Sequence, residues 1–208
     1  MIQFGMRAHD ACRPAPMTEA LDAVKAQGLE HLQLAFEKSF SDYDFTTGHY
    51  SAGFAHKIGR ELAKRDLHVA VLGCYINPVH PDDAARAAEV ARFVERLRYA
   101  KHCGADMVGT ETGRFSPDMS VTDATYGPEC YSTLLDSFST IVDAAERLGV
   151  TVGGGERVQP HPAHPRNDGP LPQGHRLPGG GGHSGRCQPG GPLGRYGGGA
   201  ERPHQQSL

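Results

Sequence analysis

The sequence predicts an α/β protein with a parallel sheet over residues 1–153, followed by a disordered Gly/Pro-rich tail over residues 154–208. The first observation is the continuous apolar run His68–Cys74, which is typical of a strand buried on both faces. The second is the alternation of such short runs with longer segments of helical periodicity. The third is a change in composition: of the 55 residues from Gly154 onward, 15 are Gly and 9 are Pro. Such a segment carries too little apolar surface to order itself.

The elements before His68 follow from apolar patterning and from helix end signals. Thr18 can cap the first helix, and Gly28 can close it. The second helix has an apolar stripe formed by Phe54, Ile58 and Leu62. A polar and aromatic loop is expected over residues 37–49. The expected order is strand Ile2–Met6, helix Glu19–Gln27, strand His31–Phe36 and helix Ser51–Arg65.

The elements from His68 onward repeat the same pattern. Asp82 or Asp83 can cap a long helix, and Gly104 follows its end. Gly149 stops the last helix in the same way. The expected order is strand His68–Cys74, a loop to Pro81, a helix to His102, strand Asp106–Gly113 with its exit loop, a polar loop over 114–128, helix Tyr131–Leu148 and a strand that starts at Val150–Val152.

Alternating strands and helices imply a parallel sheet with right-handed crossovers. Two folds fit this pattern, a doubly wound sheet and a (β/α)8 barrel. No GxGxxG sequence follows the first strand, which argues against a dinucleotide-binding fold. A complete barrel takes roughly 250 residues. We therefore expect a partial (β/α)8 TIM barrel, with about four βα units plus a fifth strand over residues 1–153.

Composition narrows the class of protein. The net charge of -3 and the pI near 6.4 do not favour a nucleic-acid-binding surface. The five Cys are widely spaced and odd in number, which indicates reduced thiols in a cytoplasmic protein. The N-terminus has no signal-peptide apolar core, and no run of about 18 apolar residues predicts a membrane span. We expect a cytoplasmic protein without nucleic-acid or membrane partners; its oligomeric state stays open.

Polar side chains follow four consecutive predicted strands. In parallel α/β folds the C-terminal ends of the strands carry the chemistry. Glu111 is the candidate catalytic carboxylate, because it lies between two glycines directly after an apolar strand. Arg114 could bind a phosphate or carboxylate through a bidentate fork. Ordinary solvated loop residues are the alternative interpretation. The candidates for substrate binding are His9, Tyr75, Asn77 and Arg114.

Four segments together resemble one family. They are Val71–Pro78 (VLGCYINP), Tyr99–Asp106 (YAKHCGAD), Gly109–Gly113 (GTETG) and Ala144–Val152 (AAERLGVTV). In this order they are similar to the sugar-phosphate isomerase/epimerase family, the xylose-isomerase-like TIM barrel, which also includes apurinic endonucleases. The resemblance covers residues 1–153.

The resemblance implies a divalent metal (Mn, Mg, Co or Zn in intact relatives) bound by two Glu, one Asp and one His. It also implies a small sugar-like substrate and proton exchange by two carboxylates at the carbon next to a carbonyl. The first metal Glu is expected near Gly155, and Glu156 comes one place later. Glu156 is therefore the candidate for both a catalytic role and metal binding. The other three ligands have no counterpart, so the chain itself could lack a metal.

The tail admits three interpretations. Its five His could bind metal, although their spacing fits no zinc pattern. It could instead be a disordered linker or interaction segment. The third interpretation is a one-base frameshift near codon 154. Codons permitted by Gly181–Pro192 spell, one base later, Val-Glu-Val-Ile-Leu-Asp-Ala-Val-Asn-Leu-Val-Asp, which resembles the sixth strand of the family with its metal Asp.

The leading functional hypothesis is an isomerase or epimerase that acts on a keto sugar or polyol by metal-assisted proton transfer. We expect this activity to be impaired or absent, because the second half of the barrel is missing from the predicted elements. One alternative is a metal-dependent hydrolase similar to apurinic endonucleases. The other is a non-catalytic partial barrel with an interaction tail.

The frameshift hypothesis predicts the nucleotide sequence around codon 154. Sequencing the gene should show an open frame, shifted by one base, that encodes further strands and a metal-binding Asp. Stop codons in the shifted frame, or an encoded amino-acid sequence without strand and helix periodicity, would rule the hypothesis out.

Overall fold

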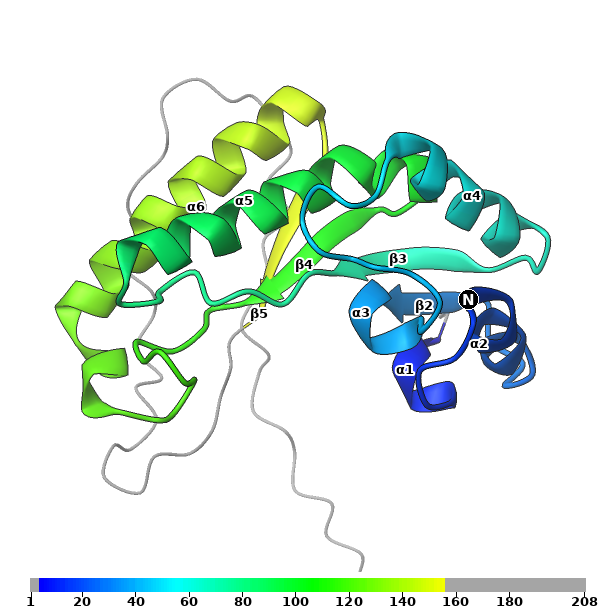
Figure 1. Cartoon of the computed structure of the whole chain (residues 1–208), viewed down its shortest axis with the longest axis horizontal. Helices are drawn as coiled ribbons and strands as arrows, with labels where there is room; N and C mark the ends of the chain where they lie inside the picture. The colour runs from blue at the N-terminus through cyan, green and yellow to red at the C-terminus, as the bar shows by residue number, and fades with distance from the viewer. Residues whose placement is uncertain (1–3, 156–208) are drawn as a thin grey trace, which may run out of the picture. The chain divides into compact units, whose positions relative to one another are not determined.

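The computed structural model describes residues 4–155, as strands and helices that alternate along the chain (Figure 1). The predicted tail lies outside the described residues from Glu156 onward. The elements are β1 (Gly5–Arg7), α1 (Ala8–Ala11), α2 (Met17–Lys25), β2 (His31–Leu34), α3 (Phe36–Ser39), α4 (Ala52–Ala63), β3 (His68–Gly73), α5 (Asp83–Ala100), η1 (Lys101–Cys103), β4 (Met107–Glu111), η2 (Asp123–Tyr126), α6 (Pro128–Leu148) and β5 (Thr151–Gly155), where η marks a short 3-10 helix.

Within residues 4–155, the strands form one parallel sheet in the order β1-β2-β3-β4-β5. This sequential order is that of a barrel, whereas a doubly wound sheet reverses its strand order part of the way through. Helices α4, α5 and α6 lie along one side of the sheet (Figure 1). The predicted partial (β/α)8 barrel is therefore confirmed.

The two faces of the sheet differ because successive side chains point in opposite directions. Leu34, Val69 and Val108 are buried on the face that the helices cover. An irregularity between β2 and β3 changes the register, so that Leu32 pairs with Val69 while Gln33 pairs with Val71. The extra residue, Ala70, restores the alternation, and Leu72 is fully buried as well.

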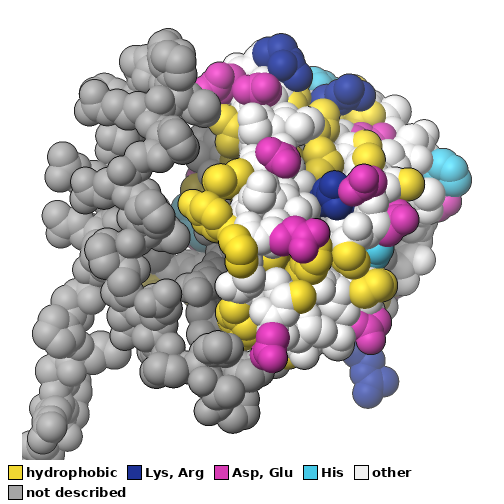
Figure 2. Space-filling model, turned by 90° about the vertical axis from the view of Figure 1, so that its left-hand side faces the viewer, with side chains coloured by type: hydrophobic (Ala, Val, Ile, Leu, Met, Phe, Trp, Pro, Cys, Tyr) yellow, Lys and Arg dark blue, Asp and Glu magenta, His cyan; other side chains and the backbone are white. Residues whose placement is uncertain are grey.

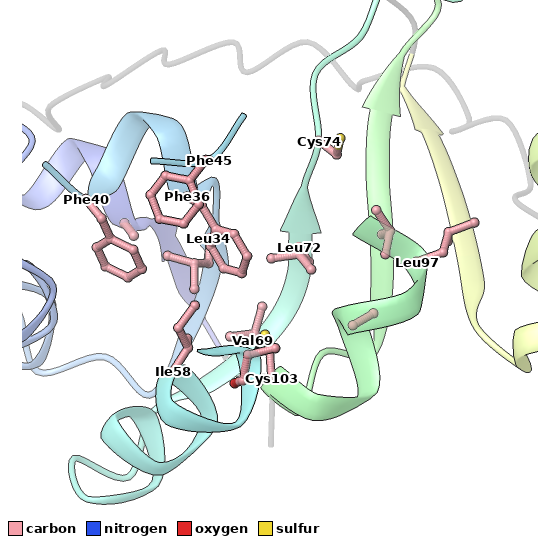
Figure 3. Packing of buried hydrophobic residues seen from close by; sticks show 14 of the residues in the cluster. Leu34, Phe36, Phe40, Phe45, Ile58, Val69, Leu72, Cys74, Leu97 and Cys103 are labelled. Carbon is pink, nitrogen blue, oxygen red and sulfur yellow. Dashed lines mark hydrogen bonds between the residues drawn. The ribbon is translucent and has the colours of Figure 1, made fainter. Parts of the chain in front are cut away.

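The core beneath the helices is continuous, and its aromatic part lies near the C-terminal end of β2 (Figure 3). Residues 37–49 were predicted as a loop, but their first residues belong to the short helix α3. Phe36 begins this helix, and its ring centroid lies 5.3 Å from that of Phe45 and 6.1 Å from that of Phe40. Aromatic pairs at such distances stabilise the segment beyond the area they bury.

The charged side chain of Arg96 lies fully inside this core. Arg96 of α5 is fully buried, and its guanidinium lies 4.5 Å from the ring centroid of Phe36 and 5.1 Å from that of Tyr50. Its Nη2 donates to Oε1 of Glu37, and the two groups form an ion pair. The aromatic faces and the carboxylate offset part of the cost of burying this cation, while Nε and Nη1 of Arg96 have no hydrogen-bond partner among the described residues.

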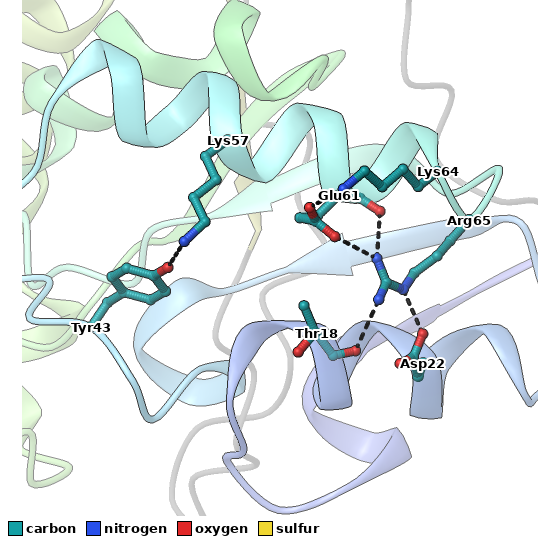
Figure 4. Close-up of polar contacts among 7 residues, drawn as sticks. All are labelled: Thr18, Asp22, Tyr43, Lys57, Glu61, Lys64 and Arg65. Atoms are coloured by element: carbon teal, nitrogen blue, oxygen red, sulfur yellow. Dashed lines mark hydrogen bonds and ion pairs between the residues drawn. The ribbon is translucent and has the colours of Figure 1, made fainter.

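The predicted cap at Thr18 is wrong. Helix α2 begins one residue earlier, at Met17, whose backbone N–H donates to Oδ1 of Asp42 at 3.0 Å. The cap thus comes from a distant loop, which helix signals near Thr18 could not reveal. Thr18 instead accepts a hydrogen bond at its backbone oxygen from Arg65, which also pairs with Asp22 and joins α4 to α2 (Figure 4).

The last strand reaches past the predicted tail boundary at residue 154. β5 pairs with β4 through Gly154 and Gly155, and the backbone N–H of Thr112 donates to the oxygen of Gly155 at 3.1 Å. A side chain at Gly153 would lie 3.1 Å from Sδ of Met107. The glycines thus allow close packing at this edge of the described sheet.

The described cysteines agree with the reduced thiols that the cysteine spacing predicts. The four described cysteines (Cys12, Cys74, Cys103 and Cys130) are free thiols, as expected. Burial raises the pKa of the Cys103 thiol to about 12, so this group is inert.

Among residues 4–155, no helix has the length and apolar character that a membrane span needs. The face with η2 and the start of α6 exposes Tyr126, Tyr131 and Leu135, and Figure 2 shows hydrophobic and acidic side chains interspersed there.

Replacement of Arg96 by Ala should lower the free energy of unfolding by about 2–4 kcal/mol, because it removes the ion pair and leaves a cavity between two rings. Urea denaturation followed by circular dichroism measures this change. Arg98→Ala on the exposed face of the same helix is the control and should cost less than about 0.5 kcal/mol. Equal effects of the two variants would contradict the stabilising role of the buried pair.

Candidate functional site

Within residues 4–155, the C-terminal ends of the strands bring polar side chains together on the face of the sheet opposite α4, α5 and α6, which we call the uncovered face. Gln33 of β2 and Glu111 of β4 lie at alternating positions on this face. Arg7 ends β1 and Tyr75 follows β3, while Lys38 comes from α3. We call these five side chains the rim cluster.

Tyr75 is the centre of the rim cluster. Nε2 of Gln33 donates a hydrogen bond to its hydroxyl oxygen, and Nζ of Lys38 lies 4.0 Å from its ring centroid. A side chain at Gly73 would lie 3.2 Å from Cε2 of Tyr75 and 3.5 Å from Nε2 of Gln33. The absence of a side chain at residue 73 therefore lets the phenol fold back over β3 toward β2.

Burial, together with the charge of Glu111, favours the protonated phenol of Tyr75. Burial raises the pKa of Tyr75, and the negative charge of Glu111 raises it further. Arg7 and the hydrogen bond from Gln33 act in the opposite direction but are weaker. At neutral pH the Tyr75 hydroxyl is therefore a hydrogen-bond donor to a ligand oxygen.

A cavity of about 540 Å³ adjoins the rim cluster on the uncovered face of the sheet. Arg7 and Gln33 line one part of it. The part near the N-terminal ends of the strands contains His68, whose Nε2 lies 2.7 Å from Oδ2 of Asp106, and His31, whose ring packs edge-on against that of His68. A cavity lined by donors and acceptors suits a small polyhydroxylated ligand.

His9 lies on α1, beside the rim cluster. Its Nδ1 is buried and has no hydrogen-bond partner among the residues that the structure describes. Burial lowers the pKa of His9, and the charges of Lys38 and Arg7 lower it further against the opposing effect of Asp10. A neutral imidazole here could donate a hydrogen bond to a ligand that reaches α1, or accept one from it.

Asn77 and Arg114 are brought together, but they hold two loops to each other. Nδ2 of Asn77 donates to the backbone oxygens of Arg114 at 2.9 Å and of Ser116 at 3.2 Å, while Oδ1 accepts from the backbone N–H of Arg114 at 3.0 Å. The Arg114 guanidinium donates to the backbone oxygen of Met119 at 2.8 Å. Gly113 has a φ of 75°, and a Cβ there would overlap Asn77 Oδ1.

The described residues do not fit the metal site that the resemblance implies. Residues 4–155 contain no group of three His, Cys, Asp or Glu side chains placed to hold a metal ion. Glu156, the predicted metal ligand, lies outside the described residues. In the register of β4 and β5, Glu111 pairs with Gly155, the last described residue.

Among the members of the rim cluster, Tyr75 and Glu111 were predicted from the sequence as site residues, whereas Arg7, Gln33 and Lys38 were not. The signal for Gln33 was available, because it is a polar residue that alternates with the buried Leu32 and Leu34. Lys38 could not be recognised, since residues 37–49 were expected to be a loop and only the helix α3 turns Lys38 toward the ring of Tyr75.

Comparisons with known proteins agree with this fold. A family model described as xylose isomerase-like TIM barrel matches residues 21–171, a range that includes Glu156. The chain belongs to this family. No curated protein matches it.

Solved structures show the same fold at low sequence identity. They include 3-keto-D-glucoside 4-epimerase YcjR from E. coli (13% identity, TM-score 0.56, covering 74% of this chain and 56% of that one). D-psicose 3-epimerase matches with 16% identity and a TM-score of 0.54, covering 73% of this chain and 51% of that one. The IolI protein with a bound zinc atom matches with 11% identity and a TM-score of 0.54, covering 74% of this chain and 51% of that one. The chain thus spans about half the length of these structures.

Asn77→Asp should release the loop after β4, because its new carboxylate oxygen would face the backbone oxygens of Arg114 and Ser116. We expect a loss of about 2 kcal/mol in the free energy of unfolding. Trypsin should cleave faster after Arg114, and mass spectrometry of the fragments measures the rate. An unchanged cleavage rate at Arg114 would show that Asn77 does not hold this loop.

Proposed function

We propose that this chain carries the substrate-binding half of an isomerase or epimerase site for a small keto sugar or polyol. The rim cluster is the observation that supports the proposal. It places a carboxylate, a phenol and a cation at the strand ends where TIM barrels carry their chemistry. Family membership and the epimerases among the structural neighbours support the same reaction class.

The reaction requires removal and return of a proton at the carbon next to a carbonyl. Glu111 is the carboxylate that accepts this proton. Tyr75 donates a hydrogen bond to the carbonyl oxygen, where negative charge develops, and the Lys38 ammonium adds positive potential beside it. Arg7 and His9 bind the hydroxyl groups of the substrate at the end of β1.

Catalysis by this chain is proposed to be weak. Epimerisation uses two carboxylates on opposite sides of the reacting carbon, and the rim cluster contains one. The second carboxylate and any divalent metal depend on residues after 155, where Glu156 is our candidate for both roles. Asn77 and Arg114 support the rim by holding its loops and do not contact substrate in this proposal.

Hydrolysis of abasic DNA is a less suitable function. A protein that binds the phosphate backbone needs a basic surface. The net charge of this chain is -3, and the face shown in Figure 2 displays more acidic than basic side chains.

Exchange of substrate hydrogen with deuterium oxide tests the proposed reaction. In the presence of the wild-type chain and Mn²⁺, D-fructose or D-psicose should incorporate deuterium at the carbon next to the carbonyl, as measured by proton NMR. Glu111→Gln should slow this exchange about 100-fold, because it removes the base. Glu129→Gln, at an exposed position in α6, is the control and should leave the rate unchanged.

Two results would count against the proposal. Equal exchange rates in the wild type and in Glu111→Gln would exclude Glu111 as the base. No exchange with any keto sugar, together with no binding of Mn²⁺, would favour the alternative of a non-catalytic partial barrel.

A further inference from the structure

The hydrogen bond between Gln33 and Tyr75 joins two elements that the sheet already connects. The backbones of β2 and β3 are paired along the strands, so the sheet does not need this side-chain contact. The contact nevertheless lies on the uncovered face, with Gln33 lining the cavity beside it. Its geometry depends on Gly73, since a Cβ there would crowd both the Tyr75 ring and the Gln33 amide.

The direction of this hydrogen bond determines what Tyr75 can do. The side-chain amide of Gln33 donates, and the phenol oxygen of Tyr75 accepts. A phenol that accepts through its oxygen keeps its own hydrogen available for a second partner. Lys38, which lies over the ring, carries only donors and cannot accept that hydrogen.

We propose that Gln33 is a positioning residue, which holds Tyr75 so that the Tyr75 hydroxyl donates its hydrogen to the carbonyl oxygen of the substrate. This proposal rests on the proposed function and adds a residue to it. Gln33 itself does not contact the reacting atoms. Its amide N–H limits the rotation of the phenol, and the Lys38 ammonium restricts the ring from the other element, α3. A donor fixed before the substrate arrives stabilises the developing charge better than a mobile one.

A double-mutant cycle tests the coupling between the two residues. Gln33→Met keeps the length of the side chain and removes the donor; it should lower kcat/KM for keto-sugar exchange about tenfold, mostly through kcat. Tyr75→Phe should lower it at least as much. In the double variant the effect of Gln33→Met should vanish, because there is no hydroxyl left to position. Gln27→Met, at an exposed position after α2, is the matched control and should behave as the wild type.

NMR of the full chain labelled at the tyrosine ζ-carbon gives a readout that does not require turnover. Tyr75→Phe assigns the Tyr75 signal. Gln33→Met should raise the pKa of Tyr75, because loss of the amide donor destabilises the phenolate, whereas Gln27→Met should leave that pKa unchanged.

The two measurements separate failure of this proposal from failure of the proposed function. An unchanged Tyr75 pKa in Gln33→Met, or equal effects of Gln33→Met with and without the Tyr75 hydroxyl, would overturn the positioning role. If the wild type catalyses no hydrogen exchange in a keto sugar, the proposed function fails, and the role of Tyr75 toward a substrate carbonyl fails with it. The pKa of Tyr75 measured by NMR still decides whether Gln33 holds Tyr75.

Discussion

The register of the parallel strands is the constraint on which the rest of this structure depends. Because side chains alternate across a strand, the register places Leu34, Val69 and Val108 under the helices, while Gln33 and Glu111 lie on the opposite face. The extra residue in β3 keeps this separation intact, with Leu72 under the helices and Gln33 beside Val71. Without Ala70, the residues of β3 that follow it would pair with β2 in a different register, and Tyr75 would lie at a different position relative to β2.

Helix α3 connects the buried core to the rim cluster. Its first residue, Phe36, packs against the guanidinium of Arg96, and the next residue, Glu37, forms the ion pair with it. Lys38 follows directly and lies over the ring of Tyr75. The buried cation on one side of the helix thus orients a cation on the other side, and a contact far from the cavity contributes to the geometry of the site.

The rim cluster is formed by a part of the chain that matches about half the length of the solved structures. Neighbouring strands contribute its members, so the cluster needs only the pairing of β1 to β4. A metal centre has a stricter requirement, because several ligands must converge on one point. Residues 4–155 bring no such group of three together. The proposed substrate-binding residues therefore form no metal centre among themselves within residues 4–155.

The sequence by itself determined the class of fold, the order of its strands and two members of the rim cluster, Tyr75 and Glu111. These features follow from local periodicity and from the position of a residue after an apolar run, and both can be recognised directly in the sequence. Only the tertiary structure decided the contacts between distant segments: Asp42 caps α2, Arg96 lies inside the core, and Asn77 holds a loop instead of facing the cavity. It also decided that Gln33 holds the hydroxyl of Tyr75, because that contact depends on strand register and on the space left open by Gly73.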